Sequence, residues 1–379
     1  MDYLPYHIFF LLVFILIVLL ITIINLFSLK SLNDFPEIDN YPKVSVLIPA
    51  RNEEDSIEKC VCSLLEQDYP DFEVIVFNDN SSDKTGIILE NIKKKYEDII
   101  IIDGGEKPID WSGKHWACHQ LAGLAKGEYY LFTDADTYHK KKSLMKAVNC
   151  IKYKNLDLLT VIPKQLVKSW SEQLIVPIMS WSILSFLPIL LAEKAKTRRL
   201  QITMGQFMLF RGSTYHKIGG HEAIKTEILD DMPLGRLIKS SGYKWGIADG
   251  TDNLECHMYK NFNEVYNGFT RNLFCAFNYN IPLFLWVWFV LALVVIQPII
   301  IIILFFLNIE IPRTFVLQSI LTIFLAFFIW AISICKFKYP KHLILVYPIS
   351  MVLIFIIAIR SIYQTLTRRI EWKGRKIKR

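Results

Sequence analysis

Two carboxylates flank a single small residue in Asp134-Ala-Asp136, near the middle of the chain. Acids at this spacing can point at one hard cation, and Mg²⁺ or Mn²⁺ prefers such oxygen ligands while keeping positions for waters and phosphates. Because like charges this close repel each other, a bound cation would stabilise the pair. The triplet therefore indicates a divalent metal site facing a phosphate-bearing ligand, although a simple acidic turn has the same composition.

Two further polar clusters come earlier in the chain. Pro49-Ala-Arg-Asn-Glu-Glu54 and Asn78-Asp-Asn-Ser-Ser-Asp-Lys-Thr85 each follow a short apolar run, just as the acidic triplet follows Tyr129-Tyr-Leu-Phe-Thr133. Taken singly, each cluster can be explained by helix N-caps, such as Asn52 and Ser82, or by turn residues. Three clusters at the ends of successive apolar runs instead predict one shared binding site.

The apolar pattern predicts the elements that position these clusters. Short apolar runs alternate with helix-like stretches, which is typical of an α/β unit with a mainly parallel sheet. Ligands of such sheets bind at the carboxyl ends of the strands. The predicted strands are 43–49, 72–77, 99–102, 129–132 and 158–162, and the predicted helices are 53–67, 83–96, 114–126 and 143–152.

Composition places this unit beside a membrane. Apolar residues make up 53% of the 379 residues, and the mean hydropathy is +0.31. Three charge-free runs, 8–29, 281–307 and 315–335, are each long enough to cross a bilayer core. A fourth run, 343–359, is shorter and carries Pro348, so it either spans or re-enters the membrane. The apolar segment 174–191 contains two prolines and predicts interfacial helices, with a buried core helix as the alternative.

Charge and cysteine content restrict the setting. Lys336, Lys338 and Lys341 lie between the third and fourth runs, so the positive-inside rule predicts a multi-pass protein of the cell membrane with its main domain in the cytoplasm. The basic C-terminal tail conflicts with a full fourth span, which would place it outside. Because much of the +7 net charge lies in that tail, nucleic-acid binding is disfavoured. The odd number of cysteines, seven without a C-x-x-C pair, indicates reduced thiols and disfavours a zinc site.

The polar clusters, with Ser112-Gly-Lys114 between them, resemble the ordered signature of glycosyltransferase family 2, which has a GT-A fold. More motifs are similar to the membrane-anchored branch of the family that contains the 4,4'-diaponeurosporenoate (carotenoid) and hopanoid-associated glycosyltransferases. These motifs are Trp111-Ser-Gly-Lys-His-Trp-Ala-Cys118, Gly205-Gln206, Gly219-Gly-His221, Ile228-Leu-Asp-Asp231 and Glu371-Trp-Lys-Gly-Arg375. The resemblance implies a Rossmann-like α/β domain with a mainly parallel mixed sheet, held by N-terminal and C-terminal transmembrane helices.

The resemblance also implies where a nucleotide-sugar donor binds. Pro49, Arg51 and Glu53 match the loop around the nucleoside. Asp79 matches the acid that hydrogen-bonds the uracil base, and Lys114 matches a basic residue that faces the sugar nucleotide.

A second group of matching residues concerns the metal and the acceptor. Asp136 matches the acid that binds Mg²⁺ or Mn²⁺, with Asp134 beside it towards the ribose and sugar. Gly205 and Gln206 match a loop that lines the sugar and acceptor side. Asp231 matches the general base of an inverting transfer.

Departures from the family pattern narrow the predicted reaction. Asn78 stands where a second acid is frequent, and Asp230 replaces the usual Glu before the base. The Q-x-x-R-W motif of processive synthases is not found, and Arg271-Asn272 is its nearest approach. We therefore expect metal-dependent transfer of a single sugar from UDP-glucose, or a similar donor, to a membrane lipid such as a carotenoid acid. The alternatives are a polyprenyl-phosphate or polysaccharide-linked glycosyltransferase, or an inactive membrane protein that binds nucleotide sugars.

The chain is expected to have four parts. They are an N-terminal anchor over 1–30, a GT-A domain over 31–280 with an interfacial segment at 170–192, a transmembrane region over 281–363, and a basic cytosolic tail over 364–379.

Overall fold

The computed structural model describes residues 4–367, 371–372 and 375–376, so half of the basic tail lies outside the described residues. The chain divides into two compact units. The sheet unit consists of Leu29–Leu166 and Ile189–Met258. The helical unit is assembled from three separate segments, Met1–Ser28, Val167–Pro188 and Tyr259–Arg379.

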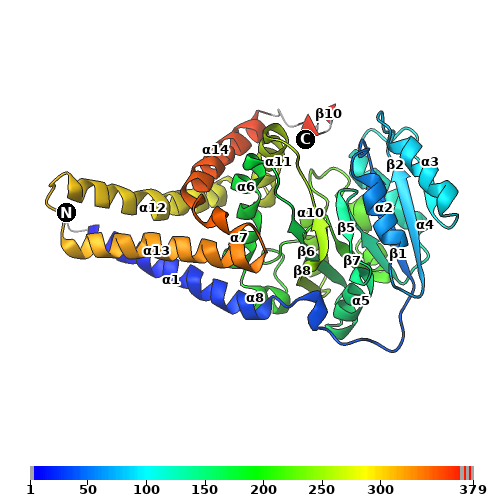
Figure 1. Cartoon of the computed structure of the whole chain (residues 1–379), viewed down its shortest axis with the longest axis horizontal. Coiled ribbons are helices and arrows are strands. Elements are labelled where there is room, and N and C mark those ends of the chain that lie inside the picture. The colour runs from blue at the N-terminus through cyan, green and yellow to red at the C-terminus, as the bar shows by residue number, and fades with distance from the viewer. Residues whose placement is uncertain (1–3, 368–370, 373–374, 377–379) are drawn as a thin grey trace. The chain divides into compact units, whose positions relative to one another are not determined.

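The sheet unit contains one mixed sheet of eight strands in the order β3-β2-β1-β4-β7-β6-β8-β5 (Figure 1). Parallel pairing joins β3, β2, β1 and β4, and it also joins β6 to β8. Strands β7 and β5 pair antiparallel with their neighbours. The strands are β1 (Val44–Ala50), β2 (Phe72–Asn78), β3 (Ile100–Asp103), β4 (Tyr129–Phe132), β5 (Thr137–His139), β6 (Leu158–Gln165), β7 (Met208–Arg211) and β8 (Trp245–Cys256).

The sheet unit contains the four helices that the apolar pattern predicts, each after a strand, and three further helices. They are α2 (Ile57–Leu65), α3 (Thr85–Lys95), α4 (Gly113–Leu124), α5 (Ser143–Tyr153), α8 (Ile189–Lys194), α9 (Gly212–Lys217) and α10 (Asp231–Ser240), with short 3₁₀ helices η1 (Leu32–Asp34) and η2 (Gly220–Ile224). Helix α2 begins four residues later than expected, because the backbone at Asn52 is left-handed with φ 51° and the chain turns before the helix can start.

The parallel register brings the candidate motifs to one edge of the sheet. Ala50 at the end of β1 pairs with Asn78 at the end of β2, which pairs with Asp103 at the end of β3. Leu47 pairs with Phe132, the last residue of β4. Apolar side chains from these strands and from α2, α3 and α5 form the buried core beneath that edge. The core thus fixes the strand ends, and the polar loops that follow them share one edge.

The helical unit contains four helices that are long and apolar enough to cross a membrane, by length and composition: α1 (Leu4–Ser28), α12 (Ile281–Phe306), α13 (Arg313–Lys336) and α14 (Tyr347–Leu366). In Figure 1, α1, α12 and α13 run side by side, while α14 is inclined to them and packs against α6 and α11. The remaining elements are α6 (Trp170–Ile175), α7 (Pro177–Phe186), α11 (Phe262–Ala276), η3 (Lys341–Ile344), β9 (Glu371–Trp372) and β10 (Arg375–Lys376).

The apolar segment 174–191 folds as three short helices rather than one. Helices α6 and α7 belong to the helical unit, where α7 packs against α1 and α13. The side-chain amide of Asn25 in α1 donates to the carbonyls of Leu184 and Leu187, at 2.8 and 2.6 Å. These bonds satisfy carbonyl groups at the end of α7 that have no partner within the helix. Helix α8, after Pro188, belongs to the sheet unit.

Candidate active site

The loop after β1 contacts the loop after β2 through Arg51 and Asp79. The Arg51 guanidinium donates to the Asp79 carbonyl at 2.6 Å and lies 3.6 Å from its carboxylate, which is buried. The Asp79 amide donates to the carbonyl of Ala50 at 2.8 Å. Nearby, the Glu53 amide donates to the Thr85 hydroxyl at 2.8 Å. Residues expected to surround a nucleoside are therefore held together by the sheet and by one another.

Asn52 and Ser82 do not act as helix N-caps. The side-chain oxygen of Asn52 accepts from the Ser82 amide at 2.8 Å, so it joins the two loops. The N-cap positions of α2 and α3 are Ser56 and Lys84. Pro49 lies within β1, paired in register with Phe77 of β2. The N-cap interpretation of these motifs was wrong, because their side chains bond across the strand ends.

The acidic triplet lies in the turn between β4 and β5. The Asp136 carboxylate accepts from the Cys256 thiol at 3.4 Å, and the His257 amide donates to the Asp136 carbonyl at 3.3 Å. Burial, followed by the charges of Asp134 and Glu53, raises the pKa of Asp136 to about 7. A divalent cation would relieve this accumulation of negative charge, so the carboxylates of the triplet fit a metal ion of the magnesium or manganese type.

Lys114 is a bridge between two acids that are far apart in the sequence. Its ammonium lies 2.7 Å from Asp134 Oδ1 and 3.0 Å from Asp230 Oδ2. Burial opposes the charge on Lys114, but the two carboxylates raise its pKa well above the ordinary value. Burial likewise opposes the charge on Asp230, and the Lys114 ammonium outweighs it, so the pKa of Asp230 is lowered. Asp134 and Asp230 therefore share one cation, the Lys114 ammonium.

Asp231 is the first residue of α10 and is held in place by two amides. Its Oδ2 accepts from the Gly205 amide at 3.1 Å, and its Oδ1 accepts from the Met232 amide at 2.6 Å. Burial and then the charge of Asp230 raise the pKa of Asp231 to about 7. A carboxylate that titrates near neutral pH is suited to accept a proton as a general base.

Gly205 and Gln206 lie in the loop that precedes β7, and they are placed differently. A side-chain carbon on Gly205 would lie 3.4 to 3.6 Å from atoms of Lys114, Asp231 and Asp230, so Gly205 packs directly over this charged group. The Gln206 side chain is buried and accepts from the Gln165 amide at 3.0 Å. Gly205 thus meets the candidate site, whereas the Gln206 side chain is engaged inside the sheet unit.

Sequence reasoning missed the buried histidine at the start of α4. His115 Nε2 lies 3.3 Å from the carbonyl of Leu229, which can only accept, so Nε2 carries the proton. Its Nδ1 accepts a short hydrogen bond from the hydroxyl of Ser112, the N-cap residue of α4. Burial lowers the pKa of His115, which keeps the ring neutral. His115 therefore fixes the backbone directly before Asp230. No local sequence signal distinguishes it from a structural histidine.

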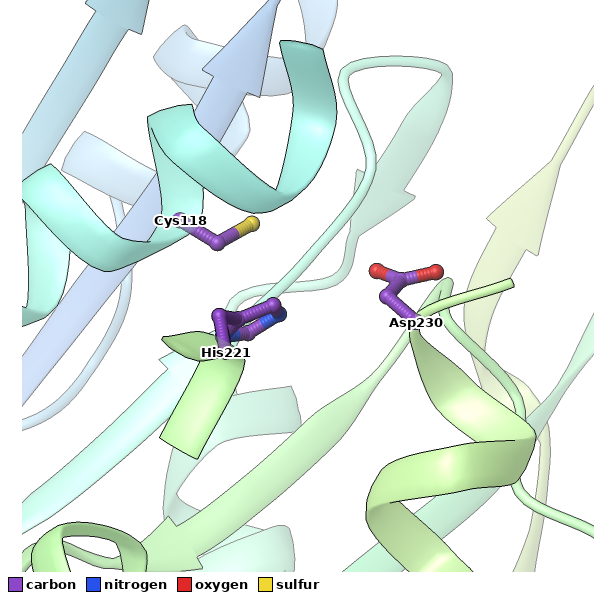
Figure 2. Close-up of side chains that lie close together, drawn as sticks. All are labelled: Cys118, His221 and Asp230. Atoms are coloured by element: carbon purple, nitrogen blue, oxygen red, sulfur yellow. The ribbon is translucent and has the colours of Figure 1, made fainter. Parts of the chain in front are cut away.

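A second missed cluster consists of Cys118, His221 and Asp230, whose side chains face one another in Figure 2. Their ligand atoms all lie within 4.8 Å of one another, a spacing that a metal ion could bridge. The chemistry of the cluster argues against a metal, because the Lys114 ammonium already neutralises Asp230 at 3.0 Å. Burial also raises the pKa of the Cys118 thiol well above its ordinary value, so no thiolate is available. We interpret the cluster as a buried group that packs beside the acids.

Comparison with known proteins finds similar sequences and similar folds. The profile of the family described as "Glycosyl transferase family 2" matches residues 45–219, which include β1 to β7. A mannosyltransferase from Pyrobaculum calidifontis, solved in complex with GDP-Man and Mn²⁺, superposes with a TM-score of 0.52 at 16% identity, covering 94% of this chain and 98% of the other. This likeness concerns the fold, which is of the GT-A class. Residues 45–219 of the chain therefore match a family 2 glycosyltransferase domain.

Two curated relatives align with different shares of the chain. The poly(ribitol-phosphate) beta-glucosyltransferase of Bacillus spizizenii is 36% identical over 118 residues, 31% of this chain and 18% of the relative. The 4,4'-diaponeurosporenoate glycosyltransferase of Staphylococcus aureus is 26% identical over 237 residues, 62% of this chain and 61% of the relative. The chain thus spans less than two thirds of the length of either relative.

Proposed function

We propose that this protein is an inverting glycosyltransferase that moves a single sugar from a nucleotide-sugar donor, UDP-glucose in the first instance, to a lipid acceptor such as a carotenoid acid. The observation that carries the proposal is the Lys114 bridge. It joins the acidic triplet, on the donor side of the family signature, to the segment that holds the candidate base Asp231. Donor and acceptor chemistry would then meet at one charged centre.

The donor would lie across the strand ends. Pro49, Arg51, Glu53 and Asp79 would hold the nucleoside, with Asp79 bonding the base. Asp136 would hold Mg²⁺ or Mn²⁺ beside the diphosphate, since Lys114 already neutralises Asp134. The metal, when bound, would stabilise the negative charge of the leaving nucleoside diphosphate.

Asp231 would act on the acceptor. Its pKa near 7 lets it take the proton of an acceptor hydroxyl as that oxygen attacks the anomeric carbon. The Gly205 and Met232 amides would hold the carboxylate in one orientation. An acceptor that is itself a carboxylate arrives without that proton, so its transfer would depend less on Asp231.

A lipid acceptor is supported by the four apolar helices and by the similarity to the diaponeurosporenoate enzyme. We place the chain in the cell membrane as a multi-pass protein, with the sheet unit in the cytoplasm. The higher identity to the poly(ribitol-phosphate) beta-glucosyltransferase, over 118 residues, favours a second candidate, transfer to a polymer-linked acceptor.

Membranes from expressing cells, supplied with radiolabelled UDP-glucose and Mn²⁺, would test the proposal. Label should enter the organic-solvent extract, and Asp231→Asn and Asp136→Asn should each abolish most of it. Asp98→Asn, at an exposed acid between α3 and β3 and outside the candidate motifs, is the control and should transfer normally. Label confined to an insoluble polymer would select the second candidate. Membranes that transfer no more label than vector membranes, with any UDP-sugar, would refute both.

A further inference from the structure

A surface of the sheet unit combines exposed leucines with a run of bases. Leu190 and Leu191 in α8 are 49% and 55% exposed. The bases that follow, in the last turn of α8 and in the loop after it, are all exposed. We call this the leucine–basic surface, and it consists of Leu190, Leu191, Lys194, Lys196, Arg198 and Arg199.

The charges of the leucine–basic surface are not neutralised within the described part of the chain, where none of its four bases forms an ion pair. The adjacent acid, Glu193, is already engaged. Its carboxylate lies 2.5 Å from the Lys154 ammonium and also accepts from the Ile247 amide at 3.3 Å. The surface therefore presents four positive charges to a ligand outside the sheet unit.

A buried lysine fixes both ends of this loop. The ammonium of Lys239 in α10 donates to the carbonyl of Ala192 and, at 2.6 Å, to the carbonyl of Leu200. It also lies 5.5 Å from the centre of the Trp245 ring, a cation–π distance. The bases consequently project from a loop whose two ends are anchored to the same helix, so little order has to be gained when they bind a partner.

The pairing of leucines with bases indicates the chemistry of the partner. A nucleic acid or a soluble acidic protein would use the bases and leave two large apolar side chains in water. A bilayer surface with anionic lipids uses both, because the leucines enter the acyl boundary while the bases contact phosphates. Leu190 also lies only two residues after Pro188, where a segment of the helical unit ends. The helical unit contains the four candidate membrane spans.

We propose that the leucine–basic surface docks onto the headgroups of anionic phospholipids. Docking would restrain the loop that leads from α8 to Gly205, and it would make the sheet unit sensitive to the charge of the membrane. The interaction does not require that the protein transfer sugars.

Fluorescence of a label at Leu190→Cys tests this docking in the full-length protein, reconstituted in vesicles. The exposed Cys335 and the half-buried Cys62 are first replaced by serine. An environment-sensitive dye at residue 190 should shift to shorter wavelengths in phosphatidylcholine–phosphatidylglycerol vesicles relative to phosphatidylcholine alone. Salt at about 1 M, where the Debye length is about 3 Å, should reverse the shift. The matched control is Ile109→Cys, at a fully exposed apolar residue of the same unit, which should not respond.

Replacing all four bases by glutamine should lower the ratio of docked to undocked label by about 10²–10³-fold, since each base near an anionic surface contributes roughly one kilocalorie per mole. Equal emission in both vesicles would overturn the proposal. So would an equal response at residue 109, or a response to soluble polyphosphate without one to vesicles. Because the readout is dye emission, these outcomes are independent of whether the enzymatic proposal holds.

Discussion

Replacing Asp230 by asparagine tests whether its charge sets the protonation of Asp231. The pKa of Asp231 rises from 3.8 to about 7, first through burial and then through Asp230. A carbon on Gly205 would lie 3.5 Å from Asp231 Oδ2 and 3.6 Å from Asp230 Oδ1, so these oxygens are at most about 7 Å apart. At ~7 Å and an effective dielectric constant of about 20, two unit charges repel by about 2.4 kcal/mol, or about 1.7 pKa units.

Asp230→Asn should therefore lower the pKa of Asp231 by about 1 to 2 units. In the natural protein, the Lys114 ammonium offsets part of this repulsion while it pairs with Asp230. In the variant, no carboxylate at position 230 competes with Asp231 for that ammonium. The ionised form of a general base is the active one, so activity rises with pH through its pKa. The acid limb of kcat/KM should move from about pH 7 to about pH 5–6.

The assay follows kcat/KM for an alcohol acceptor across this pH range at saturating Mn²⁺, which keeps a metal-bound Asp136 ionised. Donor affinity, measured by calorimetry, should stay near its natural value, and Asp231→Asn should lose the limb together with about 10²-fold or more of the rate. An acid limb that stays in place in folded Asp230→Asn, or that moves to higher pH, would refute the assignment of Asp231 as the base.

Three further changes have defined outcomes. Asp136→Asn should weaken UDP binding in the presence of Mn²⁺ by about 10–100-fold, measured by calorimetry, and equal affinities with and without the metal would contradict a metal site there. His115→Gln keeps a donor for the carbonyl before Asp230, whereas His115→Leu leaves it unpaired; only the leucine variant should lose kcat, by about tenfold, with little change in donor KM. Gly127→Ala should lower stability by about 1–3 kcal/mol, because the new carbon would lie 2.5 Å from the β1 backbone. Its control, Gly123→Ala in α4, places the new carbon in open space and should raise stability by up to about 1 kcal/mol. Melting temperatures of the two glycine variants that shift in the same direction would show that the close approach is unimportant.

The sheet edge could be predicted from the sequence because its signals are local. Each of β1, β2 and β4 is a short apolar run with its polar loop directly behind it. Parallel pairing then requires these loops to share an edge, and the observed register of Ala50 with Asn78 meets that requirement. Strand β7 was not predicted, because its four residues lie beside a helix-like stretch and its antiparallel pairing with β4 and β6 is decided by tertiary packing.

The contacts that unite the candidate site could not be predicted, because they join residues far apart in the sequence. Lys114 forms an ion pair with Asp230, and the hydrophobic periodicity of the sequence does not predict a contact between these two distant residues. The Cys256 thiol reaches Asp136 only because β8 pairs with β5 after a register shift at Pro163. The motif resemblance supplied Asp231 and Asp136 as separate residues, and the fold supplies the burial and the neighbouring charges that raise their pKa values.

The Asn25 amide, which closes the end of α7, has a consequence for biosynthesis. Its acceptor Leu184 lies 159 residues further along the chain, beyond much of the sheet unit. Closing a loop of that length costs about 4–5 kcal/mol of chain entropy in a flexible chain, but far less once the intervening residues have folded and drawn their ends together. Because the ribosome releases α1 first and α12 to α14 last, the sheet unit can be complete while the helical unit still lacks most of its helices. The order of synthesis thus favours folding of the sheet unit before the helices of the helical unit come together.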